Sequence, residues 1–280
     1  MTPGAQVQTT IEILEEIWSR NIPPNEVIRN CFRNRRFAGS SDRKAIKTLI
    51  YAIIRNHARL SWWVEQSNMN GSISPRSLII VYLSSIDNFF QYKISKNFSG
   101  LRHEPEPLSE SENFFSNQLI NIELNHPKMP RYVINEYPEW LDQSFFSLWG
   151  DNIDIETQSL NKPATLDLRV NLLKSSIDQA ILFLKKENIE ASPTPLSPIG
   201  IRVKNNLPIH NTKAFKTGLI EVQDEGSQIV ALCCGVEKNM RVIDFCAGAG
   251  GKALALAGVM ANCGEIIACD TSKRRLSELK

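Results

Sequence analysis

The residues best suited to chemistry form a glycine-rich segment near the C-terminal end of the 280-residue sequence. Asp244 closes a short apolar run, and three glycines follow within a four-residue stretch, at Gly248, Gly250 and Gly251. Glycine lets the backbone turn sharply and lets a ligand approach it closely. Small and apolar residues from Lys252 onward predict a helix. A strand, a glycine loop and a helix in this order predict the opening unit of a nucleotide-binding α/β fold.

Two carboxylates help to choose among NAD, FAD and S-adenosylmethionine (SAM), all of which bind glycine loops. Asp270 ends a second apolar run 26 residues after Asp244, where an acid can accept both ribose hydroxyls of an adenosine. Asp244 lies beside the loop, where its charge would repel a pyrophosphate but suits a ligand that carries an amine. We therefore predict SAM over a dinucleotide. The plainer alternative is that both acids only cap strand ends.

Six cysteines are the other reactive side chains, and their spacing predicts no metal site because no Cys-x-x-Cys pair is present. They are Cys31, Cys233, Cys234, Cys246, Cys263 and Cys269. We expect all of them to be structural, with Cys233 and Cys234 on a core helix. The sequence shows neither a signal peptide nor an apolar run of about 18 residues. These observations predict a cytoplasmic protein with reduced thiols and no membrane span.

Composition and charge are those of a folded globular protein, since 42% of the residues are hydrophobic and 22% are charged. The formal net charge is only +2, but residues 29–59 hold nine Lys and Arg against one acid, Asp42. Such a segment suits a polyanion, and the ordinary alternative is a solvated helical face. The candidate contacts are Arg29, Arg33, Arg35, Arg36, Arg43, Lys44, Arg55 and Arg59.

Apolar residues at spacings of three and four predict helices over most of the first 150 residues. Ile11, Leu14 and Ile17 share one face of the first helix, which the prolines at 23 and 24 end. A longer helix is predicted from residue 43, after a turn at residues 39–42. Another helix follows Pro75 and reaches Phe90, and residues 102–112 form a polar, acidic loop.

Alternating polar and apolar residues after Pro163 predict a change to strands. The predicted strands cover residues 165–170, 200–203 and 218–222, and a helix capped by Ser176 runs through residue 186. Residues 191–198 contain three prolines and are predicted to be a loop. A helix over residues 228–234, stopped by Gly235, precedes the glycine motif.

Six stretches resemble one family and occur in that family's order along the chain. They are residues 41–44, 49–55, 137–141, 168–174, 221–230 and 244–252. They resemble Sun-type RNA cytosine-5 methyltransferases of the bacterial ribosomal-RNA branch, whose N-terminal domain is similar to the antitermination factor NusB. The resemblance implies an all-α NusB-like domain at residues 1–130. It also implies linker helices with a small α/β RNA-binding subdomain at residues 131–222, and the first part of a Rossmann-like methyltransferase domain at residues 223–280.

The same resemblance implies SAM as the cofactor and ribosomal RNA as the partner, with RNA contacts among the basic residues of the segment 29–59. The implied cofactor contacts are Cys246, Ala247, Gly248, Ala249, Gly250, Gly251, Lys252 and Asp270. The loop departs from the commoner sequence of the family's motif at Gly248 and Ala249, where an alanine and a proline are more usual. Ala253 stands where threonine is frequent. Because these residues are small, we expect cofactor binding to persist.

The family's catalytic motifs do not occur in this sequence. Carbon 5 of cytosine is not nucleophilic, so a thiolate must first add to carbon 6. The family uses two cysteines, one after Asp-Ala-Pro and one within Thr-Cys-Ser, and neither motif is present. We therefore nominate no catalytic residue and expect no methyl transfer from these 280 residues alone.

The predicted methyltransferase domain looks incomplete, because it has two parallel strands and a last helix without a stop signal. We expect a fragment, a disrupted gene product or half of a split enzyme that a second chain of unknown identity would complement. Two other hypotheses stay open. One is an RNA-binding module whose catalytic half is lost, and the weaker one is a dinucleotide-dependent enzyme with a helical appendage.

Overall fold

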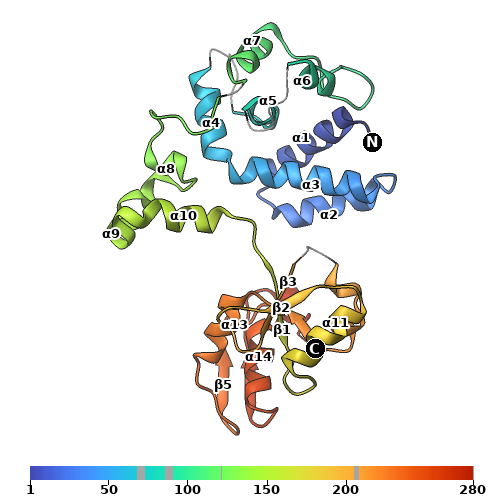
Figure 1. Ribbon diagram of the computed structural model, residues 1–280, viewed down its shortest axis with the longest axis vertical. Helices are drawn as coiled ribbons and strands as arrows, with labels where there is room; N and C mark the ends of the chain where they lie inside the picture. The colour runs from blue at the N-terminus through green and yellow to red at the C-terminus, as the bar shows by residue number, and fades with distance from the viewer. Residues whose placement is uncertain (68–72, 86–90, 121, 205–207, 280) are drawn as a thin grey trace. The chain divides into compact units, whose positions relative to one another are not determined.

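The computed structural model describes residues 1–280 except 68–72, 86–90, 121, 205–207 and 280 (Figure 1). The described residues form two compact units, Met1–Lys162 and Pro163–Lys280. The prediction that one helix reaches Phe90 falls on residues outside the described ones. The domain bounds expected at residues 130 and 222 stay predictions, and the compact units divide after Lys162 instead.

The N-terminal unit is helical in its described residues, as the sequence predicted. Its helices are α1 (Pro3–Arg20), α2 (Pro24–Asn34), α3 (Ser40–Arg55), α4 (His57–Gln66), α5 (Pro75–Ser85), α6 (Gln91–Asn97), α7 (Glu110–Gln118), α8 (Arg131–Ile134), α9 (Asp142–Trp149) and α10 (Ile153–Asn161). Short 3-10 turns occupy Glu139–Leu141 and Gly150–Asn152. The helix expected from residue 43 begins at Ser40, because Asp42 in its first turn accepts the backbone amide of Gly39 at 3.0 Å.

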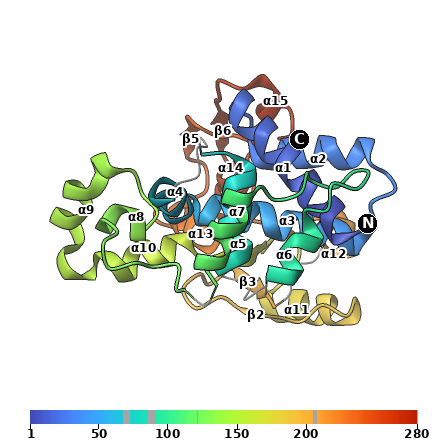
Figure 2. The same ribbon diagram turned by 90° about the horizontal axis from the view of Figure 1, so that it is seen from above.

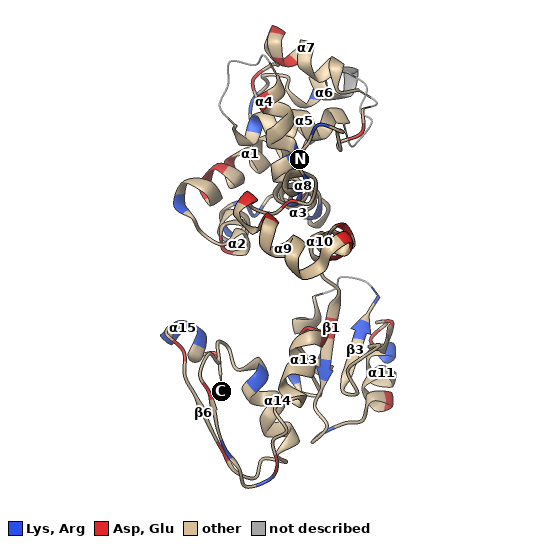
Figure 3. Cartoon of the chain, turned by 90° about the vertical axis from the view of Figure 1, so that its left-hand side faces the viewer, with Lys and Arg blue, Asp and Glu red and all other residues tan. Residues whose placement is uncertain are grey.

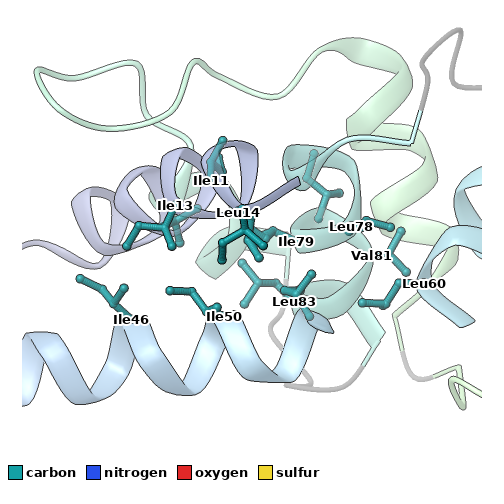
Figure 4. Packing of buried hydrophobic residues seen from close by; sticks show 14 of the residues in the cluster. Ile11, Ile13, Leu14, Ile46, Ile50, Leu60, Leu78, Ile79, Val81 and Leu83 are labelled. Carbon is teal, nitrogen blue, oxygen red and sulfur yellow. The ribbon is translucent and has the colours of Figure 1, made fainter. Parts of the chain in front are cut away.

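Helix α5 is the centre of this unit. Nine of its eleven residues are buried, and it contacts α1, α3, α4, α6 and α7 (Figures 1 and 2). Figure 4 shows Ile79 of α5 beside Leu14 of α1, in a buried cluster that also includes Ile46 and Ile50 of α3. A helix that is apolar around most of its circumference is stable only when other helices surround it. The likeness of this unit to NusB stays a prediction.

The C-terminal unit contains a four-stranded antiparallel sheet with the order β2-β3-β1-β4. Its strands are β1 (Leu166–Val170), β2 (Ala191–Pro193), β3 (Gly200–Val203) and β4 (Ile220–Val222). Helix α11 (Ile177–Lys186) begins at a capping box made by Ser176 and Gln179. The turn Ile209–Asn211 and α12 (Lys213–Lys216) lead to β4. Leu168, Ile201 and Ile220 join Leu184 of α11 in the core.

One prediction for this sheet was wrong. Residues 191–193 form the edge strand β2 and not the start of a loop, with Ala191 opposite Val203. Pro193 is compatible with this place because a proline, which has no backbone N–H, is tolerated on an edge strand. The other three predicted strands are confirmed within one or two residues at each end.

The glycine motif lies on a second, parallel pair of strands, β5 (Arg241–Asp244) and β6 (Glu265–Ala268). Helix α13 (Glu225–Leu232) contacts both β1 and α14 (Gly251–Val259), so it joins the antiparallel sheet to the glycine motif. Val242 and Ile266 pack on the helical side, whereas Ile243 and Ile267 are exposed on the other face. The final helix is α15 (Lys273–Leu276). The Rossmann-like character of a larger sheet stays a prediction.

Candidate cofactor site

The glycine loop, residues 245–250, connects the end of β5 to the start of α14. Gly248 and Gly250 have φ of 57° and 89°, a region that side chains other than glycine enter at a cost. A Cβ on Gly248 would also stand 2.5 Å from Nη2 of Arg275, and one on Gly250 would collide with Leu279. Both glycines are therefore required by backbone conformation and by close packing.

Backbone hydrogen bonds hold the two strand ends side by side. The amide of Cys269 donates to the carbonyl of Asp244 at 2.8 Å, and the amide of Ala247 donates to the carbonyl of Cys269 at 2.8 Å. These bonds extend the β5–β6 pairing beyond the strands themselves. The structure thus brings the two predicted acids, Asp244 and Asp270, to the same end of the sheet as the loop.

Asp270 is hydrogen-bonded to the loop itself. Its Oδ2 accepts the amide of Gly248 at 2.8 Å, and its Oδ1 accepts the amide of Ser272 at 2.8 Å. The amides of Ser272 and Gly248 stabilise the ionised carboxylate and lower the pKa of Asp270 below its usual range. Each carboxylate oxygen retains further lone pairs that can accept hydroxyl groups of a ligand.

Asp244 is the unsatisfied member of the pair. Its Oδ2 is buried and has no hydrogen-bond partner among the described residues. A buried carboxylate oxygen without a donor is unfavourable, because it has lost water and gained nothing in exchange. A ligand that brings a donor, such as the amine of an amino acid, fits this position.

The other predicted cofactor residues lie in the loop or in the first turn of α14, and they differ in solvent exposure. Ala247 is buried, whereas Cys246, Ala249, Gly251 and Lys252 are exposed. Lys252 lies in the first turn of α14. Among the described residues, no group of three His, Cys, Asp or Glu side chains is placed to hold a metal ion. A direct contact of any of these residues with a cofactor stays a prediction.

The prediction that Cys233 and Cys234 lie in the core was wrong, since both are exposed at the C-terminal end of α13. That helix buries Glu225, Gln228 and Ala231, so the residues that follow its last turn point outward. In the N-terminal unit, burial raises the pKa of Cys31 and favours its neutral thiol.

The basic segment divides into exposed cations and cations with internal partners. Arg35 pairs with Glu12, and Arg59 pairs with Glu136 at 2.9 Å. Arg43 donates to the carbonyl of Ala38 at 2.9 Å. The Arg55 guanidinium is 5.4 Å from the ring centroid of Tyr51. The exposed members without a partner among the described residues are Arg29, Arg33, Arg36, Lys44 and Lys47. Figure 3 marks the Lys and Arg positions along the chain in blue. The exposed group is the better RNA candidate.

Sequence reasoning missed one polar group beside the loop, Gln223, together with its partner Arg169. Arg169 is a buried arginine inside a strand, which is the one signal that could have drawn attention to it. Among the described residues, no helix is long and apolar enough to cross a membrane.

The glycine motif and the antiparallel sheet match known families. Residues 231–280 match the family described as 16S rRNA methyltransferase RsmB/F. Residues 137–210 match the ferredoxin-like domain of RsmF/B-like methyltransferases. These two segments are similar to RsmB/F methyltransferases. Strands β1, β2 and β3 and helix α11 lie in the ferredoxin-like match, β4 lies between the two matches, and β5, β6 and the glycine loop lie in the methyltransferase match.

Curated RsmB relatives extend the similarity. The chain is 29% identical over 144 residues to the probable ribosomal RNA small subunit methyltransferase B of Coxiella burnetii, covering 51% of this chain and 34% of the relative. It is 25% identical over 223 residues to the corresponding methyltransferase of Xylella fastidiosa, covering 76% of this chain and 51% of the relative. The chain therefore matches between a third and about half of the length of these relatives.

The fold is also found in a solved structure. The protein described as PH0851 matches 100% of this chain and 66% of its own chain, with a TM-score of 0.69 and 20% sequence identity. This similarity supports the arrangement of elements described above, and at this identity it concerns the fold alone.

Proposed function

We propose that the chain is the RNA-binding and cofactor-binding part of a SAM-dependent methyltransferase that modifies carbon 5 of cytosine in ribosomal RNA. The observation that supports this best is the pair of acids at the glycine loop. Asp270 is fastened to Gly248, and Asp244 presents a buried oxygen that has no donor. An adenosine that carries an amino-acid group offers hydroxyls to the first acid and an amine to the second.

The residues of the loop would bind and orient the cofactor, which supplies the methyl group when bound. Asp270 would accept the ribose hydroxyls, as an acid at the end of the second strand does in related nucleotide sites. Gly248 and Gly250 would give the loop the positive φ values that shape it around the ligand. Asp244 would accept the amine through its free Oδ2.

Methyl transfer to cytosine would require the two cysteines of the family's catalytic motifs, and neither motif occurs in these 280 residues. Cys246 is a loop residue, and Cys269 adjoins the strand β6, so neither lies on a motif of the expected nucleophile. We propose that the thiolate that adds to carbon 6 of cytosine comes from residues outside this 280-residue sequence. On this proposal the 280-residue chain binds SAM and RNA without transferring the methyl group.

The RNA would be bound by the ferredoxin-like subdomain and by the exposed cations of α2 and α3. Arg29 and Arg33 lie four residues apart on α2, so both can approach one stretch of phosphates. We propose that the protein binds ribosomal RNA in the cytoplasm. The competing function is an RNA-binding module without affinity for SAM. The buried Oδ2 of Asp244, which has no donor, favours a ligand site at the loop instead.

Calorimetry of the 280-residue chain with SAM, S-adenosylhomocysteine and NAD tests the cofactor. We expect heat with the first two ligands and none with NAD. If the chain binds RNA but gives no heat of binding with SAM, the result would support the RNA-binding module instead. Incubation with labelled SAM and ribosomal RNA tests the missing step, and methyl incorporation by this chain alone would contradict the proposal that it lacks its nucleophile.

A further inference from the structure

The N-terminal unit has a cavity of about 590 Å³ where three segments of the chain meet. Its lining includes Gln8 and Glu12 of α1, Arg35 and Phe37 of the turn after α2, and Arg102 and His103 of the loop 100–107. A volume in this range holds a ligand about as large as one nucleotide. The lining combines an aromatic ring, cations and a carboxylate.

Phe37 supplies a ring that the protein itself does not cover. The residue is 74% exposed, and it stacks on no other ring among the described residues. The amide of Ala38 donates to the carbonyl of Arg35 at 3.1 Å and closes the turn that carries Phe37, and Ala38 is buried. The ring is therefore held at the cavity by a fixed backbone. An exposed aromatic ring can stack on any nucleobase, because every base has a π face.

Hydrogen bonds hold the loop 100–107 against the start of α1. The amide of Glu104 donates to the carbonyl of Leu101 at 2.9 Å, so residues 101–104 form a tight turn. The Glu104 carboxylate accepts the hydroxyl of Thr2 at 2.5 Å and that of Ser99 at 2.6 Å. The turn is thus fixed relative to the helix that forms another part of the cavity.

His103 has a strained backbone within this turn. Its φ is 69°, a region that side chains other than glycine enter at a cost. Arg102 and His103 are both exposed, and neither has a partner among the described residues. Strained residues with unpaired polar side chains are typical of ligand sites, where contacts with the ligand use the fixed geometry.

Glu12 gives the cavity a hydrogen-bond acceptor. It pairs with Arg35, and its Oε1 accepts Nε2 of Gln8 at 3.0 Å. Its side chain is 40% exposed, so the remaining lone pairs are accessible to a ligand. A carboxylate accepts the amino group of a base such as cytosine, whereas the carbonyl that uracil carries at the same place would be repelled.

We propose that this cavity binds one unpaired nucleotide of the RNA, with its base stacked on Phe37 and its phosphate bound by Arg102 and His103. Glu12 gives preference to a base that has an amino group. The proposal rests on the proposed function, in which the chain binds RNA, and it adds a contact with a base to the phosphate contacts of α2 and α3. The bases of an RNA duplex are stacked and paired, so a duplex cannot fill this site.

Fluorescence anisotropy with labelled oligocytidylate of about 12 nucleotides, and with an RNA duplex of equal length, tests the stacking contact. Phe37→Ala should weaken binding of oligocytidylate about tenfold, the effect of losing one base–aromatic stack, and change duplex binding less than about twofold. Phe37→Tyr keeps the ring and should bind like wild type. Phe114→Ala removes a phenylalanine of α7 that is 66% exposed, and this matched control should change neither affinity.

Two other variants test the polar contacts. Arg102→Gln should reduce the slope of log affinity for oligocytidylate against log salt by about 0.7, whereas Phe37→Ala should leave this slope unchanged. Wild type should bind oligocytidylate about fivefold more tightly than oligouridylate, the effect of one hydrogen bond. Glu12→Gln should reduce that preference, because its neutral amide oxygen is a weaker acceptor.

The Phe37 comparison decides the outcome. A wild-type chain that binds neither RNA would overturn the RNA part of the proposed function and this inference with it. If wild type binds oligocytidylate and Phe37→Ala binds it equally well, this inference alone is overturned. An equal loss in Phe37→Ala and Phe114→Ala, or an equal loss for the duplex, would also overturn it. Equal affinity of wild type for oligocytidylate and oligouridylate would overturn the role of Glu12.

Discussion

Asp270 joins the end of β6 to the glycine loop by accepting the backbone amide of Gly248 at 2.8 Å. Its other oxygen accepts the amide of Ser272, so one carboxylate orders the loop on one side and the start of α15 on the other. The same acid is the predicted ribose contact. Its role in loop order and its role in ligand binding can be separated by the choice of substitution.

Asp270→Asn should weaken SAM binding by about tenfold or more, because the amide group provides one good acceptor where the carboxylate provides two. Asp270→Glu keeps the charge but lengthens the side chain, and we expect it to recover part of the affinity. Calorimetry with SAM measures both variants. Equal SAM affinity in wild type and Asp270→Asn would show that this acid orders the loop without contacting the cofactor.

Alanine should be tolerated at a glycine inside α14 but not at a glycine of the loop. Gly248→Ala places a Cβ at a φ of 57° and against Arg275, and we expect a loss of about 1–2 kcal/mol in the free energy of unfolding. Gly258→Ala, inside α14 and with no atom within 4 Å of the new Cβ, should gain about 0.5–1 kcal/mol. Urea unfolding of the two variants checks the signs. Equal losses in both would contradict this account of Gly248.

Arg59, which the basic-segment prediction had assigned to RNA binding, forms a structural pair with Glu136. Glu136 accepts the amides of Ala58 at 2.7 Å and Arg59 at 3.1 Å, and it pairs with the Arg59 side chain. Glu136→Ala leaves buried donors at the start of α4 without an acceptor. We expect a loss of about 1–3 kcal/mol in the stability of the N-terminal unit, measured by thermal or urea unfolding. An unchanged midpoint would argue against this role.

RNA affinity should depend on the exposed cations instead. Arg33→Glu and Lys44→Glu should each weaken binding to a ribosomal RNA fragment and reduce the slope of log affinity against log salt by about one, the effect of losing one phosphate contact. Lys128→Glu, an equal charge change at an exposed site outside the segment, is the matched control. Salt titrations that give all three variants the same slope would remove the segment from the RNA-binding surface.

Local sequence signals predicted most elements but few of the contacts that define the site. Periodicity located α1, α3 and α5, and alternation located β1 and β3, because both signals lie within a few neighbouring residues. The edge strand β2 was missed, since a three-residue strand ending in Pro193 carries almost no pattern of its own. The pairs Arg59–Glu136 and Arg169–Gln223 were missed because they join residues 77 and 54 positions apart.

Asp167 gives the C-terminal unit a pH dependence with a definite sign. It is buried in β1 and accepts Nε and Nη2 of Arg202 at 2.7 and 2.9 Å, and Arg202 lowers the pKa of Asp167 below its usual range. A carboxyl with a lower pKa in the folded state stabilises the protein above its unfolded pKa of about 4, and that contribution is lost as the pH falls through the folded pKa.

Asp167→Asn should therefore be less stable than wild type by about 1 kcal/mol or more at pH 7, and the gap should shrink as the pH approaches 3. Urea unfolding of both proteins across this range measures it. Asp178→Asn, at an exposed position of α11, is the control and should show a smaller gap at every pH. A gap for Asp167→Asn that stays constant from pH 7 to pH 3 would mean that the Arg202 pair contributes nothing through its charge.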